Sequence, residues 1–201
     1  LPISPAGELD WREFGLGVQP VGDAASRVAA YRAALRGLKY LEPEERLART
    51  QAIGARHGLP ATSDLMMTVD QLRALREAGM DIGGHTVSHP ILARISDAVA
   101  AREIGEGREQ LTQWLGDAPT LFAYPNGVPG GDYGPRDVAL VRKAGFTAAV
   151  STAPGTASRD ADVYQLPRFT PWDTTMMRFG LRCAMNLMQA PAARVPQEVA
   201  A

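Results

Sequence analysis

Two of the chain's three histidines, His85 and His89, lie four residues apart in the stretch GGHTVSHP. Two imidazoles at this spacing can bind one small cation, although a tetrahedral zinc site needs more than two ligands. Pro90 disfavours helical geometry at His89, so we expect a tight loop that turns both rings toward one point. On spacing alone, metal ligation and two polar loop histidines bonded to the backbone are equally good interpretations.

A second stretch that can do chemistry is FAYPNG, at residues 122–127. Pro125 and Asn126 suit the centre of a turn that Gly127 closes, and Tyr124 is held extended because it precedes proline. The backbone N–H of Asn126 can then point into a site and stabilise an oxyanion. An ordinary turn at the end of a strand explains the same residues equally well.

Helical and extended segments alternate along most of the chain. Apolar residues at three- and four-residue spacing predict helices, and short apolar runs predict strands. We expect helices at residues 23–38, 42–58, 69–78, 96–116, 135–145 and 174–189, and strands at 80–86, 119–125, 146–152 and near Leu166. This alternation favours an α/β architecture with a parallel sheet or barrel, whose functional residues follow the carboxyl ends of the strands.

Local signals mark several boundaries. Thr68 and Gln71 have the spacing of a capping box at the start of the third helix, and Asp173 is expected to cap the last one. Residues 1–22 contain three prolines and several glycines, which predict a loop. The last dozen residues are expected to fray.

The stretches GMDIGGHTVSHPIL and FAYPNG together resemble the polysaccharide deacetylases, carbohydrate esterase family 4, whose members carry a His-[Ser/Thr]-x-x-His sequence after a strand. The resemblance covers roughly residues 66–172. It implies a distorted (β/α) barrel and a divalent metal, most often zinc, held by two histidines and an aspartate. His85 and His89 match those two histidines. The implied domains are an irregular lead with a helical insertion over 1–60, the deacetylase-like domain over 61–190 and a frayed tail over 191–201.

The implied activity is removal of N-acetyl groups from N-acetylhexosamine units of a polysaccharide or related glycan. Amide hydrolysis needs a metal that polarises the carbonyl and activates water, a carboxylate base, and donors for the oxyanion. By resemblance, the Asn126 N–H is the oxyanion donor and Tyr124 lines the sugar pocket. Trp172 is a candidate wall of the acetyl pocket, and Arg168 is a candidate for orienting the base. A core tryptophan and a surface or ion-paired arginine are the better default interpretations of those two residues.

Two departures from the family pattern concern the acids. No two aspartates are adjacent in the chain, although the family's first motif, similar to Thr-Phe-Asp-Asp-Gly, supplies the base and the metal-ligating aspartate. The late Leu-x-x-His that supplies a general acid is LPRF here, with Phe169 in the histidine position. We therefore expect an incomplete barrel that lacks its first strand, and a chain that is the downstream part of a longer protein and inactive on its own.

Composition narrows the choice of partners. The chain has 21 Lys and Arg against 22 Asp and Glu, and the arginines are scattered, so we expect no nucleic-acid-binding surface. No apolar run reaches the roughly 20 residues that span a bilayer, which predicts a soluble chain but not its compartment. The lone Cys183 cannot form an internal disulfide and is assigned no role. The expected partner is a glycan, and the sequence does not determine the oligomeric state.

Two rival interpretations belong to other classes of protein. The first is a deacetylase-like domain that binds glycan or metal without catalysis, which the absent aspartate pair favours. The second is an unrelated barrel whose histidines are structural.

Overall fold

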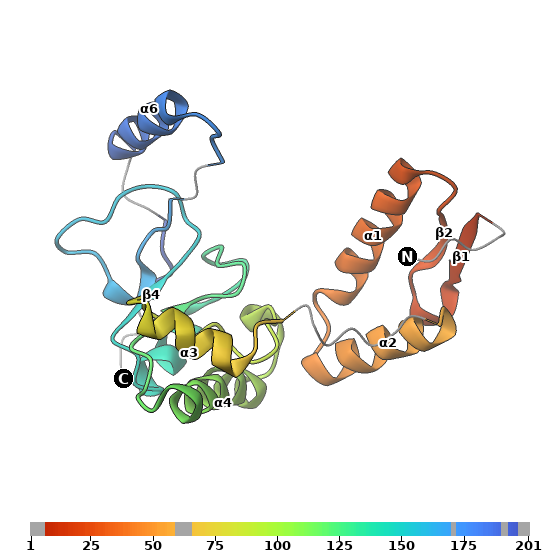
Figure 1. Cartoon of the computed structure of the whole chain (residues 1–201), viewed down its shortest axis with the longest axis horizontal. Coiled ribbons are helices and arrows are strands. Elements are labelled where there is room, and N and C mark those ends of the chain that lie inside the picture. Colours follow the sequence, from red (N-terminus) through yellow and green to blue (C-terminus); the bar gives the residue numbers. More distant parts are fainter. Residues whose placement is uncertain (1–6, 59–65, 170–171, 190–192, 197–201) are drawn as a thin grey trace. The chain divides into compact units, whose positions relative to one another are not determined.

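The computed structural model describes residues 7–58, 66–169, 172–189 and 193–196 (Figure 1). The chain divides into two compact units, Leu1–Met67 and Thr68–Ala201. Each unit has its own cluster of buried apolar side chains and therefore its own core. The boundary expected between residues 60 and 61 lies outside the described residues.

The first unit begins with a β-hairpin. β1 (Glu8–Trp11) and β2 (Gly17–Pro20) pair antiparallel, and one turn of 3-10 helix at Arg12–Phe14 joins them. The second and fourth residues of β1 are buried, as expected for a strand with one face on a core. The loop predicted for residues 1–22 is wrong over this stretch. The strands were missed because the alternation of buried and exposed residues in β1 is only four residues long and prolines and glycines surround it. Residues 1–6 lie outside the described residues.

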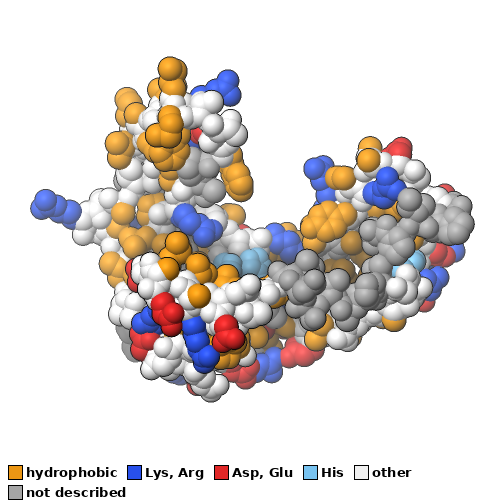
Figure 2. All heavy atoms as spheres, in the orientation of Figure 1, with side chains coloured by type: hydrophobic (Ala, Val, Ile, Leu, Met, Phe, Trp, Pro, Cys, Tyr) orange, Lys and Arg blue, Asp and Glu red, His pale blue; other side chains and the backbone are white. Residues whose placement is uncertain are grey.

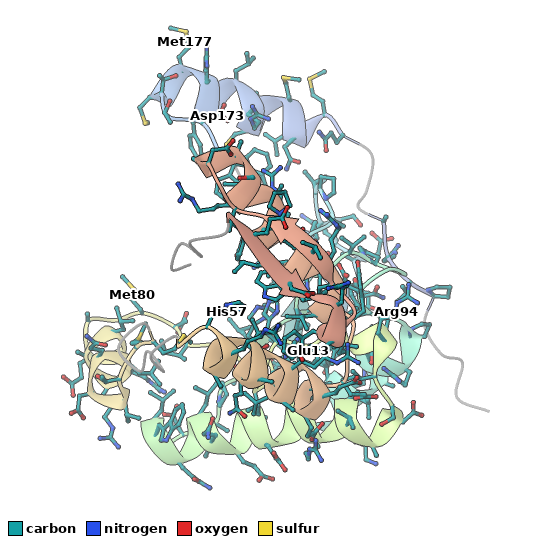
Figure 3. The ribbon with its side chains drawn as sticks, turned by 90° about the vertical axis from the view of Figure 1, so that its right-hand side faces the viewer. Glu13, His57, Met80, Arg94, Asp173 and Met177 are labelled. Atoms are coloured by element: carbon teal, nitrogen blue, oxygen red, sulfur yellow. The ribbon has the colours of Figure 1, made fainter. Side chains whose placement is uncertain are left out.

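Two helices complete the first unit, and both confirm the sequence prediction. They are α1 (Ala24–Leu38) and α2 (Pro43–Arg56), which ends at His57 (Figure 3). The Nε1–H of the buried Trp11 donates a hydrogen bond to Nε2 of His57 at 2.9 Å. This bond ties the end of α2 to the hairpin, so His57 has a structural partner within its own unit.

Polar side chains cap two helices of the second unit. The predicted capping box is confirmed: the Gln71 N–H donates to Thr68 Oγ1, and the Thr68 N–H donates to Gln71 Oε1. Ser96 Oγ accepts a hydrogen bond from the Val99 N–H at the next helix. The helices are α3 (Val69–Glu77), α4 (Asp97–Leu115), α5 (Pro135–Lys143) and α6 (Met176–Leu187), with 3-10 turns at Leu92–Arg94 and Val163–Gln165.

A short parallel sheet runs through the second unit. β3 (Leu121–Ala123) pairs with β4 (Ala148–Val150), and single bridges place Gly84 beside β3 and Leu166 beside β4. The strands predicted at 80–86 and near Leu166 are therefore wrong as strands, since each forms only one bridge. The ladders stop early because Thr86, two residues after Gly84, has a positive φ, and Pro167, directly after Leu166, has no N–H to donate.

The order of these segments places the residues predicted to do chemistry at one end of the sheet. Helices and parallel segments alternate, as the sequence predicts for an α/β unit. Because the pairing is parallel, His85 after Gly84 and Tyr124 after β3 lie at the same end of the sheet. Within the described residues, the parallel segments form an open row and do not close into a barrel.

The last helix differs from its prediction. α6 begins at Met176, and Asp173, which was expected to cap it, instead forms an ion pair with Arg182. Most of its apolar side chains are exposed: Figure 2 shows them gathered over α6, and Figure 3 shows Met177 projecting outward from the helix. No helix in the described part of the chain combines the length and the apolar character needed to cross a bilayer.

The expected frayed tail, residues 191–201, is wrong at Val195. This residue is buried, and its N–H donates to Gln165 Oε1 at 2.8 Å while its carbonyl accepts from Gln165 Nε2 at 3.0 Å. A glutamine amide can pair with a backbone in this way because it offers both a donor and an acceptor. Residues 190–192 and 197–201 lie outside the described residues.

Candidate functional site

Residues 85–90, which we call the histidine loop, bring the two predicted histidines together. The ring centroids of His85 and His89 are 4.8 Å apart, with an angle of 75° between the ring planes. Both side chains are exposed, and the segment is not helical. The arrangement follows from the loop's unusual backbone, because Thr86 and His89 have φ values of 64° and 56°. The left-handed backbone at Thr86 and the bend at residues 87 and 88 take the chain out of the extended geometry that would separate the two rings.

The orientation of His85 is fixed by the neighbouring strand. Its Nδ1 lies 2.7 Å from the carbonyl oxygen of Ala123, the last residue of β3. Because a carbonyl oxygen only accepts hydrogen bonds, Nδ1 carries a proton and donates. In the neutral imidazole, Nε2 then keeps its lone pair, and metal-binding histidines are commonly oriented by such a bond from the other ring nitrogen.

Thr86 makes two hydrogen bonds within the histidine loop. Its hydroxyl accepts a bond from the His89 N–H at 3.1 Å and donates one to the His85 carbonyl at 2.5 Å. A β-branched residue with positive φ is rare and costs conformational energy, which the surrounding structure must offset. The hydroxyl therefore stabilises a strained backbone that joins the two histidines.

Sequence reasoning missed Glu103, a buried residue of α4. Its carboxylate accepts hydrogen bonds from Val87 and Ser88, two of the three residues between the two histidines. A signal was present in the sequence, because Glu103 lies three residues after Ala100 and next to Ile104, both on the apolar face of the helix. A carboxylate on such a face must have partners that compensate its burial.

Residues 124–127, which we call the Asn126 turn, follow β3. Asn126 has a φ of 56° and Gly127 a φ of 76°. Thr152 holds the turn from the next segment: its N–H donates to the Gly127 carbonyl at 2.8 Å and its hydroxyl to the Asn126 carbonyl at 2.7 Å. In the described part of the chain the Asn126 N–H has no hydrogen-bond partner, so it is available as a donor.

The structure places Tyr124 in the core, so its predicted role as lining of a sugar pocket is not supported. The side chain is fully buried, and its ring stacks on that of Tyr133 with centroids 3.9 Å apart. The hydroxyl donates to the Tyr164 carbonyl at 2.9 Å, and burial raises the pKa of Tyr124 well above its usual range. The physical reason is the side-chain alternation of β3, which continues through Tyr124 and turns the side chains of Phe122 and Tyr124 inward together.

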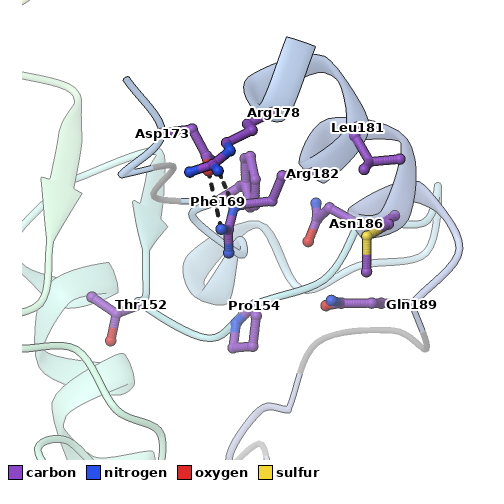
Figure 4. A pocket seen from close by; sticks show the side chains of 10 residues that line it. Thr152, Pro154, Phe169, Asp173, Arg178, Leu181, Arg182, Asn186 and Gln189 are labelled. Carbon is purple, nitrogen blue, oxygen red and sulfur yellow. Dashed lines mark hydrogen bonds and ion pairs between the residues drawn. The ribbon is translucent and has the colours of Figure 1, made fainter. Parts of the chain in front are cut away.

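A pocket of about 630 Å³ lies beside α6 in the second unit (Figure 4). Phe169 contributes an aromatic ring to it, and Arg178 and Arg182 contribute guanidinium groups. Thr152 also lines it, and the same side chain bonds to Asn126. The pocket therefore begins next to the Asn126 turn.

Trp172 and Arg168 both lie at the surface. The Trp172 side chain is 87% exposed, so the core position is wrong, and its role as a wall of the acetyl pocket stays a prediction. Nothing in the described residues covers its ring, which is why the core position fails. Arg168 is exposed, and its role in orienting a base stays a prediction.

The donor set at this edge of the sheet consists of two imidazoles. Among the residues that the structure describes, no group of three or more His, Cys, Asp and Glu side chains is arranged to share a metal ion. Two imidazoles with exposed rings fit zinc and similar divalent cations, which accept mixed protein and water ligands. His85 and His89 can therefore contribute two of the ligands that such a cation takes.

Comparison with known proteins relates the part of the chain that contains the histidine loop and the Asn126 turn to one family. The family model described as "Polysaccharide deacetylase" matches residues 47–149, about half of the chain. A curated relative, the "Putative polysaccharide deacetylase YxkH" of Bacillus subtilis strain 168, is 26% identical over 118 residues. That match covers 59% of this chain and 38% of the relative, so the chain spans well under half of the relative's length.

Two solved structures are similar in fold. The deacetylase PplD of Streptococcus pyogenes, solved in complex with acetate, matches with a TM-score of 0.50 and 21% identity over 64% of this chain and 60% of that one. The "putative polysaccharide deacetylase BA0330" of Bacillus anthracis matches with a TM-score of 0.51 and 16% identity over 71% of this chain and 48% of that one. The matched part of the chain thus shares the fold of these deacetylases.

Proposed function

The chain belongs to the polysaccharide deacetylase family, and on that premise we propose that it contributes to removing N-acetyl groups from N-acetylhexosamine units of a glycan. One observation supports this most directly. His85 donates from Nδ1 to the carbonyl of Ala123, three residues before the unpaired N–H of Asn126. A pair of imidazoles and an oxyanion donor therefore share one end of the sheet, and amide hydrolysis needs both kinds of group close together.

His85 and His89 would hold a divalent cation, for which zinc is the best candidate, since zinc binds neutral imidazoles well. When bound, such a cation polarises the amide carbonyl and lowers the pKa of water. The protein's own residues do the rest. The bond from His85 to Ala123 orients one imidazole, and the Asn126 N–H donates to the oxygen on which negative charge develops.

The pocket beside α6 is the proposed binding place for part of the sugar chain. It begins next to the Asn126 turn, and Phe169 offers the aromatic surface on which sugar rings commonly lie. Arg178 and Arg182 add hydrogen-bond donors at the same pocket. A concave surface that mixes apolar and polar groups is typical of ligand-binding sites.

We propose that these 201 residues alone hydrolyse the substrate very slowly, because the chain has no adjacent aspartates to act as base and third ligand. A positioned general base contributes roughly 100- to 10,000-fold to such reactions. The experiment measures acetate release from an acetylated chito-oligosaccharide by this chain and by the complete product of its gene, at equal zinc loading. We expect release only from a product that carries an aspartate pair.

Two outcomes would change this proposal. Equal release from the 201-residue chain would show that it contains its own base and would contradict the proposal of slow hydrolysis. Glycan binding without acetate release, from a complete product that has the aspartate pair, would favour the second candidate, a deacetylase-like domain that binds without catalysis. The absence of adjacent aspartates in this chain is the observation that favours that candidate.

A further inference from the structure

Glu103 reaches from α4 into the middle of the histidine loop. Its side chain is only 5% exposed, and its two carboxylate oxygens accept three hydrogen bonds from that loop. Oε2 accepts from the N–H groups of Val87 at 3.0 Å and Ser88 at 2.8 Å, and Oε1 accepts from the Ser88 hydroxyl at 2.7 Å. All three donors lie between the two histidines.

A second feature of α4 fixes the distance between the helix and the loop. Gly107 lies one turn after Glu103, and a Cβ atom there would lie 3.2 Å from the backbone carbon of Thr86. Any larger side chain would push the loop away from the helix, since real Cβ contacts are rarely so close. Glu103 and Gly107 thus act on the same face of α4, one by hydrogen bonding and the other by allowing close approach.

We propose that Glu103 is a positioning residue that presets His85 and His89 for binding one cation, an inference that rests on the metal site of the proposed function. The histidine loop contains two residues with positive φ, so it would sample other conformations without its anchors. Ordering a loop at the moment of binding weakens affinity, whereas a loop that is already ordered avoids this loss.

Glutamine is the informative substitution. In Glu103→Gln, the amide oxygen can accept both backbone bonds, and the amide nitrogen can donate to Ser88, whose hydroxyl rotates to accept. All three contacts can therefore persist without the charge. In Glu103→Ala, the Val87 and Ser88 N–H groups lose their acceptor altogether.

The experiment measures the zinc affinity of the whole chain by competition with a chromogenic chelator, at one fixed pH. We expect Glu103→Ala to weaken zinc binding roughly 10- to 100-fold, the usual effect of removing a residue that orients metal ligands. Glu103→Gln should restore most of that affinity. Glu106→Ala is the matched control, because Glu106 is an exposed glutamate on the same helix and its loss should change nothing.

A second readout needs no metal. Amide hydrogen exchange in the metal-free chain should quicken at Val87 and Ser88 in Glu103→Ala but not in Glu103→Gln or Glu106→Ala. If Glu103→Ala fails to fold, Ser88→Ala removes one of the three bonds from the loop side and should still weaken zinc binding by a few fold, with faster exchange at Val87.

Four outcomes decide the inference. Unchanged zinc affinity in a folded Glu103→Ala chain would overturn it while leaving the proposed metal site intact. Equal losses in the Ala and Gln variants would also overturn it, because they would show that charge and not loop geometry matters. A parent chain that binds no zinc would overturn both this inference and the metal site. Zinc binding that depends on Glu103, in a protein that releases no acetate, would support positioning and contradict only the proposed hydrolysis.

Discussion

The histidine loop and the Asn126 turn follow neighbouring parallel segments and share one backbone feature. Each contains a non-glycine residue in the left-handed region, His89 in the loop and Asn126 in the turn, both with a φ of 56°. The hydrogen bonds that hold the two segments in place come from different groups. In the histidine loop, the side chains of Thr86 and Glu103 accept hydrogen bonds from backbone N–H groups. The shape of this loop therefore depends on Glu103, a residue of α4.

The Asn126 turn depends mostly on backbone. Gly127 donates to the Pro125 carbonyl at 2.6 Å and accepts from the Thr152 N–H at 2.8 Å, and the Thr152 hydroxyl adds one side-chain contact. A turn held in this way needs glycine at one position but leaves the side chain of Asn126 unconstrained. Two segments with the same left-handed φ should therefore respond differently to substitution. The histidine loop should be sensitive to a change on a distant helix, whereas the Asn126 turn should tolerate a change of its own Asn126 side chain.

Removing the histidines should have the largest effect. The double variant His85→Ala and His89→Ala deletes both imidazoles, and we expect no detectable zinc binding in the competition titration. The chain should stay folded because both side chains are exposed. His57→Gln is the control, since His57 lies in the first unit and glutamine can still accept the bond from Trp11. Unchanged zinc uptake in the double variant would show that the loop is not the metal site.

Substitution of Gly127 should destabilise the Asn126 turn. Gly127 has a φ of 76°, and an added Cβ would lie 3.0 Å from the Thr152 nitrogen and 3.1 Å from the Tyr124 oxygen. We expect Gly127→Ala to lower the free energy of unfolding by about 2–4 kcal/mol, from left-handed strain and crowding together. Urea denaturation of the variant and the parent chain measures this loss.

Gly130 provides the matched control for that substitution. Its φ is 75°, but an added Cβ would meet nothing within 4 Å. Gly130→Ala should therefore cost only the backbone strain, about 1–2 kcal/mol. Equal losses for the two variants would show that close approach to Thr152 contributes nothing to the Asn126 turn.

Local chemistry made much of the fold predictable. The capping box at Thr68 and Gln71 gave the start of α3, and apolar spacing gave every helix of the described residues longer than one turn. The hairpin at residues 8–20 could not be predicted, because its buried alternation is four residues long within a segment rich in glycine and proline. The exposure of α6 could not be predicted either, since an apolar face indicates burial but does not name the surface that covers it.

The candidate site was predictable only where the residues are close in sequence. His85 and His89 are four residues apart, and Pro90 indicated a loop, so their meeting could be expected. Glu103 could not be assigned to that loop, because which face of α4 meets it depends on tertiary packing. Tyr124 was assigned to a sugar pocket by resemblance, but the side-chain alternation of β3 turns it into the core.

The smallest effect should come from the side chain of Asn126. Asn126→Gly keeps the N–H and favours a φ of 56°, so acetate release by an active complete gene product should stay within about threefold of the parent. Asn126→Ala keeps the same N–H but suffers left-handed strain, so it should retain most activity while losing about 1–2 kcal/mol of stability. A drop of roughly 100-fold or more in both variants, the usual result of losing an oxyanion donor, would show that the asparagine amide itself acts. The Asn126 turn would then depend on a side chain as much as the histidine loop does, and the contrast between them would be lost.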